Sequence, residues 1–407
     1  MQCGFCKSKL IKFLDLGKTP LANSFLIKKD LKKKEKIFNL TLNFCRNCYL
    51  VQAPRDVKSK EIFNEKYVYF SSTSKYWTDH AQRYCKRIVK KINLKENSSI
   101  TEVASNDGYL LRNFDKKKFR ILGIEPSKNT AKYCEKKYKI RVIKDFFNLN
   151  LIKKKNLNSK TDLLIANNVL AHNPNINNFV SSIKKTLSYA GVATIEFPHF
   201  YNLLKNFQFD TVYHEHFYYF SLKSLIKIFK KYDLKIWDVE EIDTHGGSLR
   251  IYVSHIDNKI VIKNNVKRIL KKELSSKLFN LKTLNNFSKK VEMIKKNTKN
   301  FIDLNLEKNK KIAFYGAAAK GNTFLNYLNI KAKKINHIFD LSNVKVGKYL
   351  PGSKIKVYSP SRNKLNKFDI VIILPWNLKR EIAKQLSKLI SKNCKLYVCI
   401  PKIEKIN

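Results

Sequence analysis

Short apolar runs alternate with helical patterns along most of the chain, from about residue 96 onward. Five runs come in succession within "SSITEVASNDGYLLRNF", "RILGIEPSKNTAKYCEKK", "IRVIKDFF", "TDLLIANNVLAHNP" and "GVATIEFP". Strand, turn and helix repeating in this order predict a parallel sheet whose strands are joined by crossover helices. In such a sheet a ligand binds at the carboxyl ends of the strands.

The same alternation returns near the carboxyl terminus, after a lysine-rich helical stretch that reaches about residue 308. It is carried by "KKIAFYGAAAKGNTFLNYL", "INHIFDLS", "FDIVIILPW" and "KLYVCIP". This repeat predicts a second, smaller Rossmann-like sheet. With 407 residues, 43% of them hydrophobic, the chain is long enough for two or three compact domains.

The apolar runs are too short to cross a membrane, since none approaches the roughly 18 uninterrupted residues of a bilayer-spanning helix. The first residues, "MQCGFCKSKL", hold no basic segment followed by an apolar one, so no secretory signal is visible. We therefore expect a multidomain soluble protein in the cytoplasm.

The formal net charge of +50 has two interpretations. It could serve a polyanionic partner such as RNA, because lysine and arginine neutralise phosphates. The lysine runs are spread along the whole chain, however, and accompany abundant Asn and Ile, which favours a general compositional bias with solvated lysines. We therefore expect no nucleic-acid partner, although such a surface would attract anionic small molecules.

Four of the eight cysteines form two CxxC pairs, "CGFC" and "CRNC". Thiolates at this spacing can turn onto one tetrahedral zinc ion, and two pairs complete a closed site of structural type. The alternative is four free or redox-active thiols, which a reducing cytoplasm makes less favourable as disulfides. The predicted ligands are Cys3, Cys6, Cys45 and Cys48. Cys85, Cys134, Cys394 and Cys399 lack this spacing and are expected to be buried small hydrophobic residues.

The loop after the first predicted strand, "EVASNDGYL", predicts the kind of cofactor. It has one glycine, Gly108, and no GxGxxG, so it suits a ligand without a phosphate there, while Glu102 and Asp107 suit a cationic one. Glu125, at the end of the second strand, stands where an acid pairs with the two hydroxyls of a ribose. Together with Asp145 and Phe146 after the third strand, which could border an adenine, the combination predicts S-adenosylmethionine. Ala104 and Asn106 complete the predicted cofactor loop.

The segment "TVYHEHFYYFS" holds two histidines and a glutamate among aromatic residues. Three hypotheses compete: a metal site, an acid/base centre, and an aromatic strand with polar residues facing water. On a flat strand Tyr213 and Glu215 point to one side and His214 and His216 to the other, so they can meet one ligand only if the backbone turns. A metal shared by the two histidines is less favoured, because Glu215 points away and no further HxH pair is evident nearby.

Several of these motifs together resemble the C-methyltransferases that act on nucleotide-linked 4-ketohexoses. The resemblance covers nearly the whole chain and includes the four-cysteine module, "EVASNDGYLL", "ANNVLAHNPN", "EFPHF", "QFDTVYHEHFYYFS", "THGGSLR" and "YGAAAKGNT". One departure is Lys7, which stands where a knuckle glycine is expected. The resemblance implies a zinc module at residues 1–62, a helical lead-in with an S-adenosylmethionine domain at 63–240, and a substrate domain at 241–407.

The resemblance also implies roles for single residues. It makes His216 the base that removes a proton from C3 of a nucleoside-diphosphate 4-keto-deoxysugar, with Tyr213 and Glu215 orienting or stabilising the enolised sugar. His172 matches the other active-site histidine, Tyr67, rather than Tyr69, is expected to close the pocket, and Asn168 joins the cofactor residues. His214 and His199 are expected to be structural.

The segment "GAAAKGNT" nearly spells a phosphate loop, but Asn322 stands where that motif requires lysine. A glycine turn before a helix still suits a diphosphate without hydrolysis, although packing of the helix on the sheet explains the glycines equally well. The paired glycines Gly246 and Gly247 suggest close approach of the backbone to a ligand or strand. The predicted substrate residues are Gly316, Lys320, Gly321 and Asn322, with Asp340, Lys348 and Tyr349 as further candidates. Two other functions stay open: an RNA methyltransferase or zinc-containing RNA-binding protein, and a catalytically silent scaffold.

Overall fold

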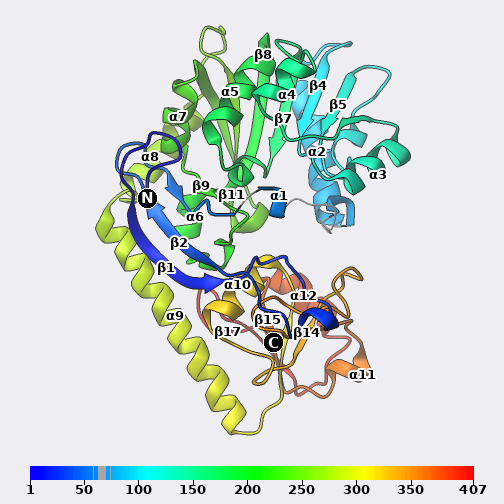
Figure 1. The fold of residues 1–407 in the computed structure, drawn as a ribbon, viewed down its shortest axis with the longest axis vertical. Helices are drawn as coiled ribbons and strands as arrows, with labels where there is room; N and C mark the ends of the chain where they lie inside the picture. The colour runs from blue at the N-terminus through cyan, green and yellow to red at the C-terminus, as the bar shows by residue number, and fades with distance from the viewer. Residues whose placement is uncertain (58, 63–69, 74) are drawn as a thin grey trace.

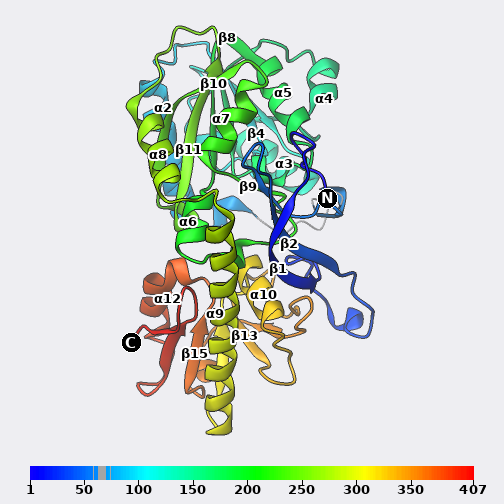
Figure 2. The ribbon, with the colours of Figure 1, turned by 90° about the vertical axis from the view of Figure 1, so that its left-hand side faces the viewer.

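The computed structural model describes residues 1–57, 59–62, 70–73 and 75–407. A seven-stranded sheet lies at one end of the molecule and a six-stranded sheet at the other, with the amino-terminal strands beside the junction of the two (Figures 1 and 2). The predicted α/β class with two Rossmann-like sheets is confirmed.

The seven-stranded sheet has the order β10-β11-β8-β7-β4-β5-β6. Its strands are β4 (Ser99–Val103), β5 (Arg120–Ile124), β6 (Arg141–Ile143), β7 (Thr161–Asn167), β8 (Leu187–Pro198), β10 (Leu234–Ile242) and β11 (Ser248–His255). The five strands from β8 to β6 are parallel, and the order reverses between β4 and β7. A ligand crevice is expected at that reversal, outside the carboxyl ends of the strands.

Helices cover both faces of this sheet because each presents one apolar stripe to it. On one face, buried residues of α2 (Lys75–Lys91) and α3 (Lys128–Tyr138) share a core with β4. On the opposite face, a second core is formed by α4 (Leu149–Lys154), α5 (Ile176–Thr186), α7 (Leu222–Lys230) and α8 (Asn264–Ser275).

The strands β10 and β11 form an antiparallel pair at one edge of the sheet, and β11 pairs with β8. The domain limit predicted at residues 240 and 241 falls within β10, so the sheet extends beyond it to His255. The glycine pair Gly246 and Gly247 lies in the connection between these two strands. From the sequence, this pair was interpreted only as a close approach of the backbone, and the strand pairing around it was not predicted.

The amino-terminal residues form a four-stranded sheet with the order β1-β2-β3-β9. Its strands are β1 (Ile11–Thr19), β2 (Phe38–Phe44), β3 (Val51–Gln52) and β9 (Tyr218–Tyr219). The first three belong to the cysteine module, whereas β9 comes from the segment that holds His216. The module is therefore joined by main-chain hydrogen bonds to the candidate catalytic segment.

The carboxyl-terminal domain follows the long helix α9 (Leu281–Glu307), which runs along the side of the molecule (Figure 2). Its sheet has the order β14-β13-β12-β15-β16-β17 and is parallel up to the last strand. The elements are β12 (Ile312–Tyr315), α10 (Ala319–Tyr327), β13 (His337–Phe339), β14 (Lys356–Tyr358), α11 (Arg362–Leu365), β15 (Ile370–Ile373), α12 (Lys379–Leu386), β16 (Lys395–Val398) and β17 (Glu404–Lys405). In the described part of the chain, no helix combines the length and apolarity needed to cross a bilayer.

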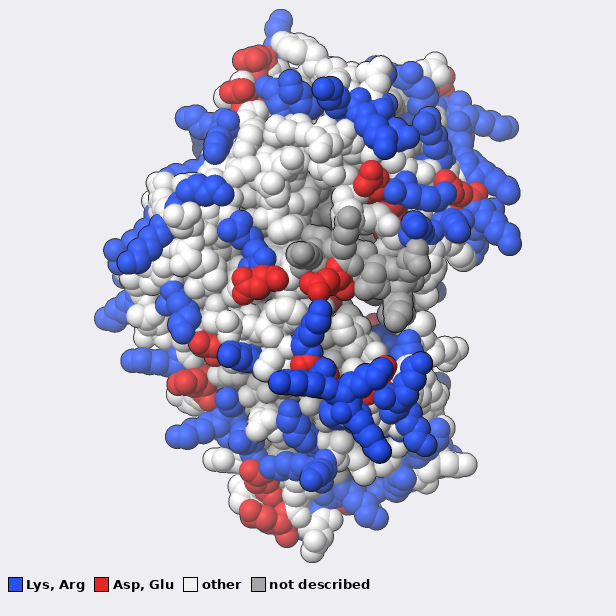
Figure 3. Space-filling view, in the orientation of Figure 1, with Lys and Arg blue, Asp and Glu red and all other residues white. Residues whose placement is uncertain are grey.

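Lysine and arginine side chains are spread over both ends of the face drawn in Figure 3. Acidic side chains lie near its middle and also in small groups toward both ends. On this face the positive charge therefore does not converge on the junction of the domains.

Candidate active site and zinc site

The four predicted zinc ligands lie together. Their sulfur atoms are all within 4.8 Å of one another, with 3.6 Å between Cys3 and Cys48 and 3.5 Å between Cys6 and Cys45. Tetrahedral zinc with Zn–S bonds of about 2.3 Å needs sulfurs about 3.8 Å apart, so the cluster fits the ion. Four thiolates leave no open coordination position, which makes the site structural.

Both cysteine knuckles have the same turn. Lys7 and Tyr49, the residues that follow the second cysteine of each pair, have φ values of 64° and 63°. Their N–H groups donate to the carbonyls of Cys3 and Cys45, at 3.1 and 2.9 Å. The turn therefore forms although Lys7 replaces the expected glycine. The cost is the strain of a residue with a side chain in left-handed backbone.

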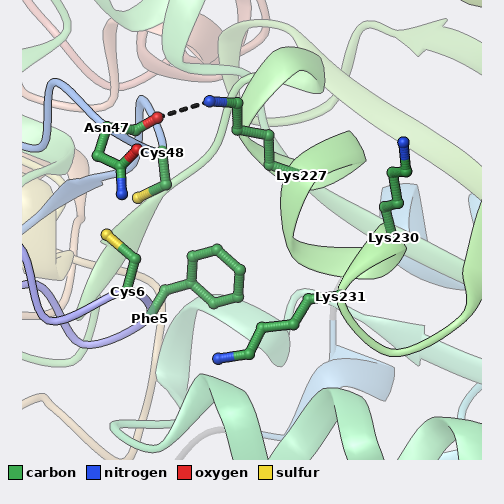
Figure 4. Close-up of a pocket in the computed structure, with 7 residues that line it drawn as sticks. All are labelled: Phe5, Cys6, Asn47, Cys48, Lys227, Lys230 and Lys231. Carbon is green, nitrogen blue, oxygen red and sulfur yellow. Dashed lines mark hydrogen bonds between the residues drawn. The ribbon is translucent and has the colours of Figure 1, made fainter.

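A basic pocket adjoins the zinc ligands (Figure 4). Lys227, Lys230 and Lys231 of α7 and the turn after it line it together with Phe5, Cys6, Asn47 and Cys48. The Lys227 ammonium donates to the Asn47 carbonyl at 2.6 Å, and Lys231 lies 5.1 Å from the centre of the Phe5 ring. A four-thiolate zinc site carries two net negative charges, which these ammonium groups offset.

The predicted cofactor loop follows β4 and lies at the strand-order reversal. Ala104 and Asn106 have left-handed φ values of 56° and 50°, and Gly108 has 79°. A Cβ on Gly108 would lie 2.4 Å from the Cys134 sulfur, so this glycine allows α3 to pack closely. The loop thus turns tightly enough to hold its polar groups at the sheet edge.

Two buried carboxylates, one near the end of β4 and one in the loop after it, have oxygens without a partner among the described residues: Glu102 Oε2 and Asp107 Oδ1. Burial and the neighbouring Asp107 raise the pKa of Glu102 well above its usual value. Unpartnered buried oxygens are costly, so they indicate a ligand that carries donors or positive charge. S-adenosylmethionine carries an ammonium, a sulfonium and a ribose, and the site fits it.

Glu125 lies directly after β5, as predicted. Its carboxylate accepts the N–H groups of Asn106 and Ser127, at 2.9 and 2.8 Å. Burial raises its pKa, and these N–H groups oppose the shift. The Ser127 and Thr130 side chains also hydrogen-bond to this carboxylate and lower its pKa, so it is held at the strand end by several donors.

The remaining cofactor candidates lie at the same edge of the sheet. Asn168 follows β7 with φ 53°, and its side-chain oxygen is buried without a partner among the described residues. Asp145 is exposed and Phe146 half-buried, two and three residues after β6. All of these residues stay predictions as cofactor contacts.

The YHEH segment turns, so its side chains do not alternate. The His216 N–H donates to the Tyr213 carbonyl at 2.9 Å, which closes a tight turn over His214 and Glu215. The Tyr213 hydroxyl consequently lies 3.0 Å from Nε2 of His216. His216 Nδ1 donates to the Thr211 carbonyl at 3.2 Å. Because a carbonyl only accepts, the proton of the neutral ring is on Nδ1, and the lone pair of Nε2 accepts from the Tyr213 hydroxyl.

His172 lies beside His216. It ends the 3₁₀ turn η4 (Leu170–His172) after β7, and the Phe217 N–H donates to the Ala171 carbonyl at 2.8 Å. The two imidazole rings are 4.7 Å apart between centres. Burial lowers the pKa of His172 to about 4, and a main-chain hydrogen bond of Glu215 opposes the shift. Burial and His172 lower the pKa of His216 well below its usual value, so both rings are neutral near pH 7.

The other residues of the predicted catalytic set have different environments. Glu215 is buried, accepts from Asn23 Nδ2 at 2.6 Å, and has a pKa that burial raises to about 7. His214 donates to the Phe38 carbonyl at 3.3 Å, which suits the expected structural role. Tyr67 and Tyr69 lie outside the described residues.

His199 is also structural. It lies 2.7 Å from the Glu273 carboxylate, and both side chains are fully buried. This pair fixes α8 against the residue that follows β8.

Two of the predicted substrate glycines have packing explanations. A Cβ on Gly316 would lie 2.3 Å from Pro375 Cδ, and one on Gly321 would lie 2.8 Å from Leu374 Cδ1. The N–H of Ala317 donates to Asp340 at 2.8 Å, so a carboxylate already occupies the turn before α10. This arrangement favours helix packing over a diphosphate at the glycines.

The environment of Asn322 counts against its predicted role as a substrate residue. Its side chain is buried and donates to the Ala22 carbonyl at 3.2 Å, because the amino-terminal module covers that face of α10. Tyr349 pairs through its main chain with Leu26, so it too contacts this module. Lys348 lies half-buried on the same turn, and no described contact brings either residue to His216.

Lys320 is the member of this set that faces the histidines. It is among the charges that lower the pKa values of His216 and His245. Its ammonium donates to Asn377 Oδ1 at 2.7 Å and lies 5.0 Å from the centre of the Trp376 ring.

Sequence reasoning missed three residues of this cluster: His245, Asp210 and Trp376. His245 has a left-handed φ of 54°, packs 4.9 Å from Trp77 between ring centres, and has a pKa that burial and Lys320 lower to about 4. His245 stands in "THGGSLR", a motif from which only the two glycines were interpreted. Left-handed backbone at a residue other than glycine is a recognised mark of functional sites.

A buried charge network lies at the end of β8. Glu196, which is fully buried, bonds to the Arg250 guanidinium of β11 with 2.7 Å from Nε, and to His80 Nε2 of α2 at 3.0 Å. Burial opposes ionisation of Glu196, but the Arg250 charge and His80 hold its pKa below the usual value. Two strands of the sheet, β8 and β11, and helix α2 are thereby linked.

Replacing Arg250 by methionine should destabilise the fold by about 3–5 kcal/mol at pH 7, because it leaves Glu196 buried without its countercharge. The lowered pKa of Glu196 stabilises the native protein above the ordinary carboxyl value of 4.5, and this contribution is lost as the pH falls through the lowered pKa. In the variant, burial raises the pKa of Glu196, so the difference in unfolding free energy between the variant and the wild type should shrink toward pH 4. Urea unfolding at pH 7 and pH 4.5 measures this difference.

The matched control is Arg268→Met. Arg268 pairs with Glu241 at 3.0 Å on the surface, with 57% and 33% of the side chains exposed, so its loss should change stability by at most about 1 kcal/mol. Equal effects of the two substitutions would show that the Arg250 network does not bear on stability.

Three families match successive parts of the chain. They are described as "Putative zinc binding domain" over residues 3–63, "Methyltransferase domain" over 76–239 and "C-methyltransferase C-terminal domain" over 243–401. C-methyltransferase NovU of Streptomyces niveus is 27% identical over 402 residues, which are 98% of this chain and 95% of that protein.

Solved structures resemble part of the chain at lower similarity. A methyltransferase of Clostridium acetobutylicum that depends on S-adenosylmethionine has 13% identity and a TM-score of 0.36, covering 44% of this chain and 92% of that one. The 1,6-didemethyltoxoflavin-N1-methyltransferase of Burkholderia thailandensis has 14% identity and a TM-score of 0.37, covering 51% and 96%.

The cofactor site, the parallel sheet and the matching methyltransferase domain define the chain as an S-adenosylmethionine-dependent methyltransferase. Its carboxyl-terminal domain matches that of C-methyltransferases, and its amino-terminal residues match a zinc-binding domain. Together with the similarity to NovU over nearly the full length, these matches support a C-methyltransferase. The family resemblance inferred from sequence and the two predicted cofactors, S-adenosylmethionine and zinc, are confirmed.

Proposed function

We propose that the enzyme methylates the carbon next to the ketone, C3, of a nucleoside-diphosphate 4-keto-deoxysugar, with His216 as the base. The observation that carries the proposal is the half-buried cluster of His216, His172 and Tyr213. A neutral imidazole with its Nε2 lone pair available is suited to remove a weakly acidic proton. The similarity to a C-methyltransferase over the full length supports carbon as the methylated atom.

The side chains supply the steps as follows. Nε2 of His216 takes the C3 proton, the electron pair of the broken C–H bond forms a double bond between C3 and C4, and the π pair of the carbonyl moves to the ketone oxygen. Tyr213, released from Nε2 when the sugar binds, donates to this enolate oxygen, with His172 as a second donor and Glu215 as an orienting group. The bound cofactor supplies the methyl group.

The cofactor would be held by residues at the carboxyl ends of β4 to β7. Glu102 and Asp107 face its positive charges and Glu125 its ribose, while Asp145 and Phe146 border the adenine. The unpartnered oxygens of Glu102, Asp107 and Asn168 support this placement. Ala104, Asn106 and Gly108 shape the turn.

Lys320 is our candidate for the anionic part of the sugar nucleotide. It belongs to the carboxyl-terminal domain and lies near enough to His216 to lower the pKa of that ring, so one ligand could contact both side chains. Asp340, Lys348 and Tyr349 remain further candidates on the same domain. The acidic side chains near the domain junction in Figure 3 support a small ligand there more than RNA.

The test is proton exchange without methyl transfer. The protein is incubated in heavy water with dTDP-4-keto-6-deoxyglucose and S-adenosylhomocysteine, and the sugar is followed by NMR. Deuterium should enter at C3, because only the carbons beside the ketone are acidified. The control, dTDP-glucose, has no ketone and should not exchange. Exchange confined to C5 would move the methylated carbon, and absence of any exchange would refute the proposal for this substrate class.

A further inference from the structure

The 3₁₀ turn η5 (Phe209–Thr211) contacts three different parts of the molecule through three consecutive residues. It lies in the central domain, five residues before His216 at its last position. Its partners belong to the carboxyl-terminal domain on one side and to the candidate base on the other.

Phe209 anchors the turn to the carboxyl-terminal domain. It is fully buried, and its ring lies 5.9 Å from Phe324 and 5.5 Å from Tyr327, measured between centres. Both partners are on α10. The position of η5 is therefore set by packing against the helix that also carries Lys320.

Asp210 makes the polar contact across the same junction. Its side chain is 1% exposed, and Oδ2 accepts from Nε1 of Trp376 at 2.8 Å. Trp376 begins the 3₁₀ turn η7 (Trp376–Leu378) after β15. Burial raises the pKa of Asp210 to about 6, opposed by Lys320 and by the indole hydrogen bond.

Trp376 is itself held in one place. A Cβ on Gly246 would lie 2.5 Å from its ring, and the Lys320 ammonium lies 5.0 Å from the ring centre on another side. Gln208, the residue before η5, donates to the Gly246 carbonyl at 2.8 Å. The indole thus has little freedom to move while the domains are in contact.

Thr211, the third residue, carries the carbonyl that accepts from Nδ1 of His216. This hydrogen bond decides which nitrogen of the neutral ring holds the proton. Asp210 is one peptide away, so displacement of its carboxylate displaces this carbonyl.

We propose that Asp210 and Trp376 are positioning residues that transmit the docking of the carboxyl-terminal domain to His216 and fix its Nδ1–H tautomer. The inference rests on the proposed function only in treating His216 as the base. It predicts that His216 holds its proton on Nδ1 when the carboxyl-terminal domain, which carries the candidate substrate residue Lys320, is docked against η5. Neither residue needs to touch the sugar for this role.

The first experiment reads the tautomer directly. Full-length protein labelled with ¹⁵N in its histidine rings is compared with Trp376→Phe, which keeps the ring but removes the N–H donor, by long-range ¹H–¹⁵N correlation. The wild type should show His216 with a protonated Nδ1 and an unprotonated Nε2, and the variant a mixture of tautomers. Asp210→Ala should resemble Trp376→Phe, while Asp210→Asn keeps an acceptor for the indole and should restore the single tautomer.

The second experiment measures deuterium exchange at saturating sugar nucleotide. Trp376→Phe and Asp210→Ala should lower its rate at least about tenfold, as expected of a misplaced base, without changing S-adenosylmethionine affinity. Trp237→Phe is the matched control, since Trp237 is buried in the central domain and its N–H has no partner among the described residues.

The two proposals fail in different ways. A single Nδ1–H tautomer in folded Trp376→Phe and Asp210→Ala would overturn the positioning role, whatever the enzyme does to the sugar. An equal loss of exchange in Trp237→Phe would also overturn it. Lack of exchange in the wild type would instead count against the proposed substrate and leaves the tautomer result valid.

Discussion

His216→Gln should lower the rate of deuterium exchange by about 10²–10⁴-fold, the usual contribution of a positioned general base. Glutamine can keep a hydrogen bond to the Thr211 carbonyl, but its amide does not take up a proton near neutral pH. Binding of S-adenosylmethionine, measured by calorimetry, should be unchanged, because the cofactor residues lie on other loops. The exchange rate follows from NMR of the sugar nucleotide.

The pH dependence of the deuterium exchange rate should also identify His216 as the base. Burial and His172 lower the pKa of His216, so its neutral, proton-accepting form persists below the ordinary histidine value of 6.5. The acid limb of the exchange rate should therefore lie below pH 6.5 and disappear in His216→Gln. His255→Gln is the control, since His255 ends β11 at the opposite edge of the sheet. An undiminished rate in His216→Gln would remove His216 as the base.

The strands, the zinc ligands and the cofactor edge could be predicted because each depends on local patterns. Apolar runs of strand length mark β4, β7 and β15, and the CxxC spacing brings thiolates together through a turn of a few residues. Glu125 was predictable because it directly follows a strand whose carboxyl end faces the crevice.

The contacts across the domain junction could not be predicted, because they join residues far apart in the chain. Asp210 and Trp376 are separated by 166 positions, and neither stands in a recognisable motif. The glycines of "GAAAKGNT" show the converse difficulty, since the same residues suit a phosphate or close packing, and only their contacts with Pro375 and Leu374 distinguish the two. The turn in YHEH was likewise open, because alternation on a strand is lost wherever the backbone bends.

The zinc module is connected to the catalytic segment by a short path. Gln52 of β3 donates to the Cys3 sulfur at 3.3 Å and pairs through its main chain with Tyr218 of β9. The next residue, Ala53, donates its N–H to the Phe217 carbonyl at 3.0 Å. Phe217 directly follows His216, so this path connects the zinc site to the backbone of the proposed base.

Cys48→Ser should therefore abolish zinc binding and also impair exchange. Binding to a structural zinc site contributes about 10–16 kcal/mol to folding, so its loss should unfold the amino-terminal module. Zinc content is measured by mass spectrometry, module folding by limited proteolysis, and exchange as above. Cys394→Ala removes a buried thiol of the carboxyl-terminal domain and should keep full zinc content and exchange. Normal exchange by zinc-free Cys48→Ser would show that β9 holds His216 in place without the module, whereas loss of exchange with the central domain still folded would confirm that the zinc acts through β3 and β9.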